Sequence, residues 1–282
     1  MTSKLVSIVI PVYNEEEYLR DCLESIKKQE LQPLEVLVID NNSTDKSVQI
    51  AKEYSFVKVF HEKKQGVVYA RNCGFNKAQG KIIGRIDADT RIDPKWVLVL
   101  EKIFKNNKIG AVSGSVYYYD VLNSDLSYKF DLYFRKDLAK RLGSEAFLLG
   151  ANMAITSELW NEIKSKTCNM KGVHEDLDLA IHANDSSKKV VFAEELRAGI
   201  SLRRYVVGFR SFIKYIQATP ETYRQHQKKC SSKFYPVLSV LVLSYWLILF
   251  SHLIYDEDTD TISLKGILKP RTKRVDPSSF ME

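Results

Sequence analysis

The chain has 282 residues, of which 45% are hydrophobic and 27% are charged, and its formal net charge is +7. This balance is typical of a globular protein with room for one large domain or two small ones, and it argues against disorder. The four cysteines are far apart and form no C-x-x-C pair, which fits a reducing compartment and disfavours a structural zinc site (Cys22, Cys73, Cys168 and Cys230).

The positive charge is concentrated in one stretch of the chain. Between Arg197 and Lys233 there are nine Lys or Arg residues and one acidic residue, Glu221. A nucleic-acid-binding protein can carry such a stripe. Here the stripe leads directly into the uncharged apolar segment 234–255, so we predict a membrane surface as its partner and no nucleic acid.

Apolar runs alternate with amphipathic ones over the first 110 residues. We predict strands at 5–12, 34–40, 57–61 and 82–87, and helices at 15–28, from about 47, at 67–77 and from 94 to about 106. The first run is too short, and too soon followed by polar residues, to be a signal peptide. Strands and helices that alternate with short connections predict a doubly wound α/β sheet.

Polar clusters follow three of these strands, at residues 13–15, 40–42 and 87–89. Doubly wound sheets bind ligands beyond the carboxyl ends of their strands, so these clusters are candidate binding residues. No G-x-G-x-x-G follows the first strand, which disfavours a dinucleotide fold of the dehydrogenase kind. No G-x-x-x-x-G-K-[ST] is present either, which excludes P-loop phosphoryl transfer.

The triplet Asp87-Ala88-Asp89 directly follows the fourth strand. Because side chains alternate along a strand, the two carboxylates are expected on the same side of its exposed end. They would repel each other unless a cation lay between them, and a divalent cation that holds a diphosphate is the natural candidate. The alternative interpretation is a turn rich in Asp, which is common at strand ends.

The second half of the chain is less regular. We predict a strand at 111–119, a helix at 125–142, a strand-like run at 147–155 with a glycine break, and a helix from about 174 to 183. The tail, 256–282, is expected to be loosely ordered.

The apolar segment 234–255 is predicted to be a transmembrane or membrane-embedded helix. Its last nineteen residues would extend roughly 29 Å at about 1.5 Å per residue, close to the thickness of a bilayer core. The alternatives are a buried core helix and one that lies in the interface. If the segment spans the membrane, the basic residues before it predict that the N-terminal domain lies on the cytoplasmic side.

Five motifs occur in an order that resembles the family 2 glycosyltransferases, which have the GT-A fold. They are Ser-Ile-Val-Ile-Pro-Val-Tyr-Asn-Glu at 7–15, Val-Ile-Asp-Asn-Asn-Ser-Thr-Asp at 38–45, Gly66 with Ala-Arg-Asn at 70–72, the D-x-D triplet at 87–89, and His-Glu-Asp at 174–176. The resemblance covers about residues 5–205. It implies a mixed, mostly parallel sheet flanked by helices.

The resemblance also implies a domain organisation. A GT-A domain would occupy 1–205, with a nucleotide half at about 1–110 and an acceptor half at about 111–205. A basic membrane-proximal segment (206–233), the apolar helix (234–255) and the tail (256–282) would follow.

The function that the resemblance implies is metal-dependent, inverting transfer of a sugar. The donor would be a nucleotide-diphosphate sugar, with a UDP-sugar as first choice, and the cofactor Mg²⁺ or Mn²⁺. The acceptor would be a lipid-linked or cell-surface glycan of the cell envelope, at the cytoplasmic face of the membrane. The sequence leaves the sugar, the linkage and the oligomeric state open.

Three other functions are considered as alternatives. A polyprenyl-phosphate glycosyltransferase differs only in its acceptor, and a non-catalytic scaffold would bind nucleotide sugars without turnover. A nucleotidyltransferase is disfavoured because the glycine-rich, basic loop after the first strand is missing. The Q-x-x-R-W motif of processive synthases is also absent, which argues against extrusion of a polymer.

The resemblance assigns roles residue by residue. Asp176 would be the catalytic base, and Asp89 with Asp87 would hold the metal ion. The nucleotide-sugar site would be formed by Pro11, Tyr13, Glu15, Asp40, Asn42, Gly66, Arg71, Asp87, Glu175 and Arg204. The acids at 175–178 would also stabilise a helix N-terminus without any catalytic role, and Arg204 would suit a basic membrane-facing patch equally well.

Overall fold

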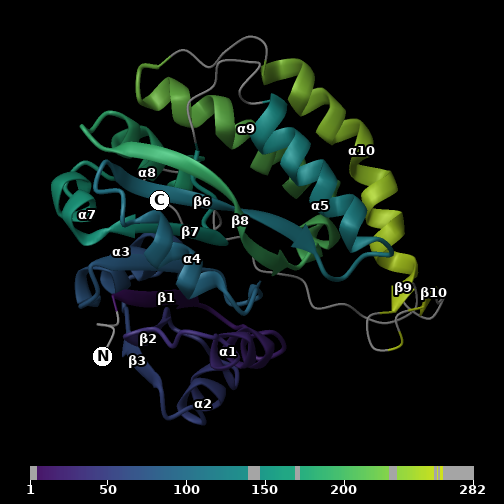
Figure 1. Ribbon diagram of the computed structural model, residues 1–282. Helices are drawn as coiled ribbons and strands as arrows, with labels where there is room; N and C mark the ends of the chain where they lie inside the picture. The colour runs from purple at the N-terminus through teal and green to yellow at the C-terminus, as the bar shows by residue number, and fades with distance from the viewer. Residues whose placement is uncertain are drawn as a thin grey trace. The chain divides into compact units, whose positions relative to one another are not determined.

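The computed structural model describes residues 5–138, 147–168, 172–228, 234–256, 259, 261 and 262 (Figure 1). The strands are β1 (Val6–Val12), β2 (Glu35–Asp40), β3 (Val57–His61), β4 (Ile82–Ile86), β5 (Arg91–Ile92), β6 (Ile109–Tyr118), β7 (Asn152–Thr156), β8 (Lys189–Ile200), β9 (Tyr255–Asp256) and β10 (Thr261–Ile262). The α-helices are α1 (Leu19–Lys27), α2 (Ser47–Lys52), α3 (Val67–Lys77), α4 (Trp96–Ile103), α5 (Ser124–Leu132), α7 (Ser157–Ile163), α8 (Glu175–Asn184), α9 (Phe209–Gln225) and α10 (Phe234–Ile254). A π-helix, η1 (Tyr133–Leu138), follows α5, and a 3₁₀ helix, η2 (Arg203–Val207), precedes α9.

The chain forms two compact units. Unit 1 comprises Met1–Val116, Ala146–Asn169 and Glu175–Gly199, and unit 2 comprises Tyr117–Glu145, Met170–His174 and Ile200–Glu282. The domain boundaries expected near residues 205, 233 and 255 stay predictions.

The sheet of unit 1 has the strand order β3-β2-β1-β4-β7-β6-β8-β5. Its first four strands are parallel, and β7 pairs antiparallel with both β4 and β6. The chain therefore has the mixed α/β architecture that the alternating pattern predicts. The parallel strands place the loops after β1, β2 and β4 at one edge, where doubly wound sheets bind ligands.

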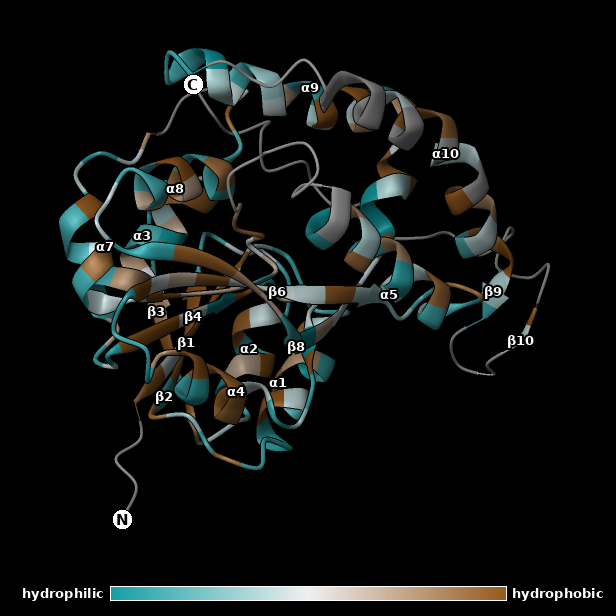
Figure 2. Ribbon diagram, turned by 45° about the horizontal axis from the view of Figure 1, so that its top comes forward, coloured by the Kyte–Doolittle hydropathy of each residue, from teal (hydrophilic) through white to brown (hydrophobic). Residues whose placement is uncertain are grey.

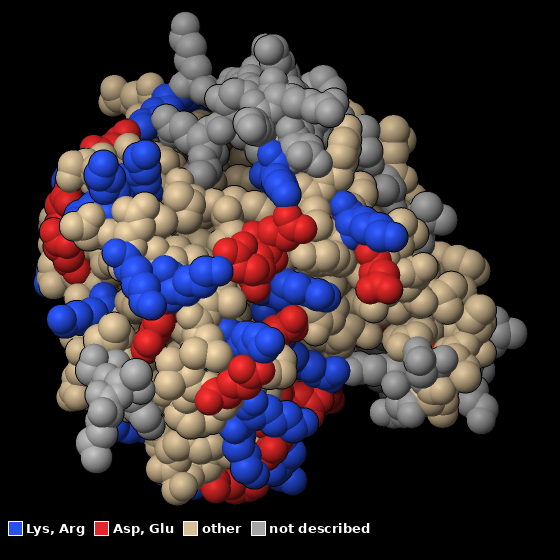
Figure 3. Space-filling model, viewed as in Figure 1, with Lys and Arg blue, Asp and Glu red and all other residues tan. Residues whose placement is uncertain are grey.

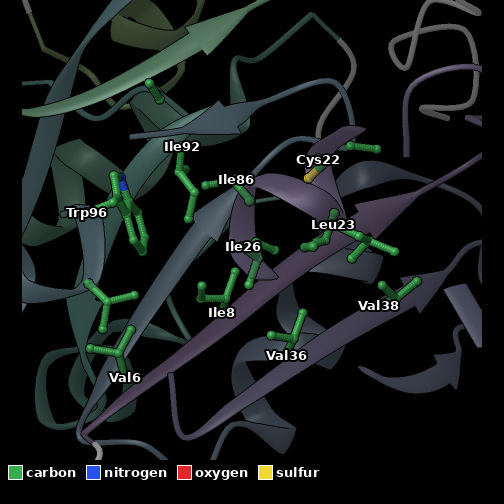
Figure 4. Packing of buried hydrophobic residues seen from close by; sticks show 14 of the residues in the cluster. Val6, Ile8, Cys22, Leu23, Ile26, Val36, Val38, Ile86, Ile92 and Trp96 are labelled. Atoms are coloured by element: carbon green, nitrogen blue, oxygen red, sulfur yellow. The ribbon is translucent and has the colours of Figure 1, made fainter. Parts of the chain in front are cut away.

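The side chains of β1 show that helices cover both faces of this sheet. Alternate residues such as Ile8 and Ile10 join a cluster with α1, α2 and α4, whereas Val9 joins a second cluster with α3, α7 and α8. Figure 4 shows the first cluster, in which Trp96 of α4 and Leu23 of α1 cover strand side chains. The hydropathy colouring of Figure 2 shows the strands of this sheet as mostly hydrophobic, as expected for parallel strands covered by helices on both sides.

The sequence pattern places most elements of the first half within a few residues, and two corrections are informative. The first helix begins at Leu19 and not at residue 15, because residues 15–18 form a turn in which the N–H groups of Tyr18 and Leu19 donate to the carbonyl of Glu15. Strand β4 ends at Ile86 and not at residue 87, so the carboxylates of the D-x-D triplet are not placed by strand alternation.

More is corrected in the second half. The run 147–155 is a strand only from Asn152, since the preceding residues form a turn closed by the Asn152 N–H and the Leu149 carbonyl, 2.8 Å apart. The helix expected at 125–142 is α5 continued by a π-helix to Leu138, and residues 139–142 lie outside the described part. Helices α7 and α9 and strand β8 were not predicted.

Unit 2 has a separate core of aromatic and aliphatic side chains (Val121, Leu202, Tyr205, Phe212, Ile216 and Tyr245). Two polar contacts fix α10 to it: the Tyr245 hydroxyl donates to the Tyr205 carbonyl at 2.7 Å, and His252 Nδ1 lies 2.8 Å from the Asp120 carbonyl. The predicted helix at 234–255 is therefore present as α10. Among the described residues, no helix has both the length and the apolarity needed to cross a membrane. Nearly all of the predicted tail lies outside the described residues.

Candidate functional site

The loops after β1 and β2 are held together by side-chain contacts to backbone. Asn14, with a φ of 53°, accepts the Thr44 N–H at 2.8 Å, and the Glu15 N–H donates to Ser47 Oγ at 2.7 Å. The side chain of Glu15 is buried, while Pro11 and Tyr13 are half-buried. The first-strand residues predicted for the nucleotide pocket thus lie beside the loop that carries Asp40.

Asp40 is buried at the end of β2. One of its carboxylate oxygens accepts the Ser43 N–H at 3.0 Å, and the other lies 3.0 Å from Nδ1 of His61 at the end of β3. The sequence analysis did not identify His61. The pair fixes the Asp40 carboxylate at the edge of the sheet where the clusters were expected to meet.

Asn41 and Asn42 organise the loop before α3. The Asn41 amide donates to the carbonyls of Glu62 and Lys64, and its oxygen accepts the Gly66 N–H at 2.7 Å. Asn42, with a φ of 67°, donates to the Lys63 carbonyl at 3.1 Å. Gly66 has a φ of 136°, which disfavours residues with a Cβ, so the predicted Gly66 position has a backbone reason.

The D-x-D triplet lies in a turn after β4, in which the Thr90 N–H donates to the Asp87 carbonyl at 3.0 Å. The Asp89 side chain is almost fully buried, whereas Asp87 is half-buried and contacts Arg85. Burial raises the pKa of the Cys22 thiol well above its usual range, and the negative charges of Asp89, Asp87 and Glu15 raise it further. These three acids, from the ends of β1 and β4, therefore lie near the Cys22 thiol.

Arg85 joins the triplet to the acids of α8. It projects from β4, is almost completely buried, and its Nη2 lies 2.7 Å from Glu175 Oε1 and 3.2 Å from Asp87 Oδ1. Burial alone would lower the pKa of Arg85, but the charges of Glu175, Asp87 and Asp176 outweigh it and the pKa is raised. Two motifs nearly ninety residues apart are thus linked through one guanidinium group.

Asp176 is anchored by backbone donors. The Gly150 N–H donates to Asp176 Oδ2 at 3.1 Å, and the Leu177 N–H donates to Oδ1 at 2.9 Å. Helix α8 begins at Glu175, so Asp176 lies in its first turn, where the helix dipole favours a carboxylate.

Arg71 of α3 is completely buried beside the same acids. Its Nη1 donates to the Glu175 carbonyl at 2.6 Å and its Nε to Asn72 Oδ1 at 3.0 Å. Burial and the repulsion from Arg85 lower the pKa of Arg71 to about 10, against the attraction of Glu175, so the group stays charged at neutral pH. Among the described residues, Arg71 Nη2 has no hydrogen-bond partner, and neither has Arg85 Nε or Nη1.

Asp178 shows that not every acid of α8 faces the same surroundings. It is fully buried and accepts the Cys168 N–H at 3.1 Å, with His182 Nε2 at 3.5 Å. Burial acts to raise the pKa of Asp178, but these two partners lower it below its usual value. Asp178 therefore fixes the first turn of α8 to the chain at residue 168.

Arg204 belongs to unit 2, where its guanidinium lies over the ring of Tyr215, 4.2 Å from the centroid. Its predicted contact with the nucleotide sugar stays a prediction. The other predicted site residues all lie in unit 1.

Three residues that organise the site were not predicted from the sequence: Arg85, Gly150 and His61. Arg85 carried a usable signal, because a charged residue within the apolar run Ile-Ile-Gly-Arg-Ile requires a buried partner. Gly150 carried none, because its contact with Asp176 joins segments that only the fold brings together.

A sequence profile described as "Glycosyl transferase family 2" matches residues 7–163. Glycosyltransferase GlyG of Streptococcus pneumoniae serotype 4 is 31% identical over 181 residues, and the alignment covers 57% of this chain and 60% of that protein. The uncharacterized glycosyltransferase MJ1057 of Methanocaldococcus jannaschii is 26% identical over 292 residues, covering 99% of this chain and 98% of that protein. This chain thus spans less than two thirds of the pneumococcal relative's length.

Among solved structures, the mannosyltransferase PcManGT from Pyrobaculum calidifontis, in complex with GDP-Man and Mn²⁺, superimposes with a TM-score of 0.63. The superposition covers 89% of this chain and 74% of that one, at 20% sequence identity. This likeness extends the shared fold well beyond the residues that the profile matches. Because the profile covers more than half of the chain and includes both β1 and the D-x-D triplet, the chain belongs to glycosyl transferase family 2.

Proposed function

We propose that this protein transfers a sugar, with inversion, from a nucleotide-diphosphate sugar to a hydroxyl or phosphate acceptor. The observation that carries the proposal is the meeting of Asp87 and the Glu175–Asp176 pair, joined by Arg85 and the Gly150 N–H. Inverting transfer needs a group that neutralises the leaving diphosphate and a base for the acceptor proton. These acids lie close enough to serve one reaction.

Asp89 and Asp87 would hold a divalent cation, Mg²⁺ or Mn²⁺. Their carboxylate oxygens are the hard ligands that such ions prefer. When bound, the ion would neutralise charge on the diphosphate leaving group. The GDP-Man and Mn²⁺ in the mannosyltransferase structure support a donor and ion of this class.

Asp176 would take the acceptor proton. Its position in the first turn of α8 and its two backbone donors favour the ionised form that a base requires. Asp40, at the edge of the sheet, would contact the nucleotide part of the donor, and the fully buried Arg71 would act through the Glu175 carbonyl that it binds. UDP is our first choice of nucleotide, and GDP is the second.

The decisive experiment measures the release of nucleoside diphosphate from UDP-, GDP- and dTDP-sugars with Mn²⁺, using glycans and polyprenyl phosphates as acceptors. We expect one donor to turn over, and Asp89→Ala and Asp176→Asn to lower the rate at least about 100-fold. Asp176→Asn should keep its affinity for nucleotide. Asp21→Asn, in an exposed pair with Arg91, is the matched control and should keep full activity.

Two outcomes contradict this proposal. Turnover that is unchanged in Asp89→Ala and Asp176→Asn would exclude the assigned roles. Nucleotide binding without turnover on any acceptor would favour the scaffold function instead. Preference for a polyprenyl phosphate over every glycan would select the polyprenyl-phosphate glycosyltransferase.

We further propose that the acceptor is membrane-bound and that α10 lies in the membrane interface. Leu243, Trp246 and Phe250 form one exposed side of α10, with 80%, 62% and 56% of their surfaces accessible, whereas Tyr245 and His252 are buried in unit 2. A helix with an apolar outer side and a fixed inner side suits an interfacial position. The basic residues of α9, such as Arg210 and Lys214, suit anionic headgroups of the cytoplasmic leaflet.

Co-sedimentation with phosphatidylglycerol vesicles tests this placement. Replacement of Leu243, Trp246 and Phe250 by Ser should reduce binding at least tenfold without loss of nucleotide affinity. Leu34→Ser/Leu98→Ser removes two exposed apolar side chains of unit 1 and is the control. Equal binding by the α10 variant and the wild type would exclude the proposed surface.

A further inference from the structure

Arg85, like Arg71, is a deeply buried charged group next to the acids of the site. It is 2% exposed on β4, between Gly84 and Ile86, in a sheet whose other described positions are mostly apolar. Burial of an unpaired guanidinium costs several kcal/mol. Its retention at this position therefore requires partners, and those partners are Asp87 and Glu175.

The Gly150 backbone lies directly against the Arg85 guanidinium. A Cβ added at Gly150 would be 2.6 Å from Arg85 Cζ and 2.7 Å from each Nη atom, closer than any carbon can approach. The same glycine donates its N–H to Asp176 Oδ2. The guanidinium thus packs against the turn before β7, and the Gly150 N–H of this turn binds the Asp176 carboxylate.

Arg85 also fixes α8 directly. Its Nη2 binds the Glu175 side chain at 2.7 Å, and the neighbouring Arg71 binds the Glu175 carbonyl at 2.6 Å. Glu175 is thereby held at two points, and Asp176 follows it in the first turn of the helix. The position of the Asp176 carboxylate is set from one side through Glu175 and from the other through Gly150.

We propose that Arg85 is a positioning residue, which holds Asp176 in register with the Asp87–Asp89 turn for transfer to the acceptor. This inference rests on the proposed function of Asp176 as the base. Arg85 itself touches neither substrate nor metal in this proposal. A lysine would keep the charge but not the planar group that contacts Asp87, Glu175 and the Gly150 backbone together.

The test compares Arg85→Met and Arg85→Lys with the matched control Arg91→Met, which removes an arginine of the same unit from a surface pair. Misplacement of a catalytic group by about 1 Å can cost about 100-fold in rate. We expect kcat to fall about 100-fold in Arg85→Met and about tenfold in Arg85→Lys. The affinity for UDP with Mn²⁺, measured by calorimetry, should stay within about threefold, and Arg91→Met should match the wild type.

A double-mutant cycle with Asp176→Asn separates positioning from general damage. If Arg85 acts through Asp176, Arg85→Met should change the residual rate of Asp176→Asn by less than about threefold. An equal loss in both backgrounds would overturn the proposal, and so would an unchanged kcat in Arg85→Met. Should Arg85→Met fail to fold, Arg85→Lys decides alone, since wild-type kcat in that variant excludes the role. Full activity of the Asp176→Asn single variant would instead contradict the proposed function itself.

Discussion

At the scale of the residue, several buried polar side chains lie at the edge of the sheet that carries the proposed site. Asp40, Asn41, Arg71 and Arg85 are all buried, and each is held by partners from a different segment. Such groups are costly when a partner is removed, because the remaining donor or acceptor loses its hydrogen bond without regaining water. Single substitutions in this set should therefore affect stability as well as activity.

Gly150→Ala tests the packing of Arg85 against the turn. The new methyl group would overlap the guanidinium, so we expect the free energy of unfolding to fall by about 1–3 kcal/mol in urea titrations. In an Arg85→Met background the guanidinium is absent, so Gly150→Ala should lower the free energy of unfolding by clearly less. Equal costs in the two backgrounds would show that Arg85 does not confine this glycine.

Glu35 provides a pH-dependent prediction away from the site. Burial acts to raise the pKa of Glu35, but the Gln79 N–H, Lys58 and Ser7 lower it below the usual value of 4.5. A carboxylate with a depressed folded-state pKa stabilises the protein above the unfolded pKa, and this contribution is lost as pH falls through the folded pKa. The stabilisation should thus be complete above about pH 4.5 and disappear below it.

Glu35→Gln should therefore lower the free energy of unfolding by about 1–3 kcal/mol at pH 7, and by less below pH 4.5. Urea titrations at a series of pH values measure this difference. Glu53→Gln removes an exposed carboxylate paired with Arg20 and should change stability little at any pH. A constant difference between wild type and Glu35→Gln across this range would contradict the assignment.

At the scale of the element, one amide of strand β7 connects helix α4 to two other strands of the sheet. Asn152 accepts the Trp96 indole N–H at 2.8 Å and donates to the carbonyls of Ser115 and Leu196 at 2.9 and 2.8 Å. All three contacts are buried. The amide therefore joins α4, β6 and β8 to the strand that pairs with β4.

Asn152→Ala should be among the most destabilising substitutions in unit 1. It leaves one donor and two acceptors buried without partners, so we expect a loss of about 3 kcal/mol or more in the free energy of unfolding. Asn161→Ala on the exposed side of α7 is the control, since its amide oxygen accepts a hydrogen bond from the exposed Lys164 side chain. Similar stabilities of the two variants would exclude a structural role for the Asn152 network.

At the scale of the whole molecule, the two units present different chemistry. Unit 1 carries the polar sheet edge, and unit 2 carries apolar side chains on α10 together with basic residues on α9. In Figure 3, Lys and Arg are interspersed with Asp and Glu over much of the visible face, so the net charge of +7 does not appear there as one continuous patch. We therefore expect nucleotide to bind unit 1 and vesicles to bind unit 2, each independently of the other.

Hydrogen exchange should show which segments each ligand protects. UDP with Mn²⁺ should protect the segments after β1, β2 and β4, and at one hundred times its Kd it should raise the free energy of unfolding by about 2.7 kcal/mol. Anionic vesicles should protect α10 instead, and their effect should weaken as salt rises from 0.05 to about 0.5 M because the charges are screened. Protection of α10 by nucleotide alone, or of the β4 turn by vesicles alone, would contradict the assignment.

Most elements of the first half could be predicted from the sequence, because their apolar residues follow a strand-like or a helical pattern. Strand β2 is an almost continuous apolar run, and the buried residues of helix α1 recur at helical spacing (Leu19, Cys22, Leu23 and Ile26). Both patterns are local properties of the sequence. The motif order was sufficient to predict the family, which the profile match confirms. The second half was predicted less completely, because short elements such as α7 and the turn before β7 depend on partners far along the chain.

What only the tertiary structure decided is how the predicted residues are held. The D-x-D carboxylates are placed by a turn and by Arg85, not by strand alternation, and Asp176 depends on a backbone N–H at Gly150. No local pattern contains these contacts, because they join β4, α8 and the turn before β7 across the fold. The sequence alone thus determined the family and the candidate site residues, whereas the contacts of the buried Arg85 guanidinium are set by long-range packing.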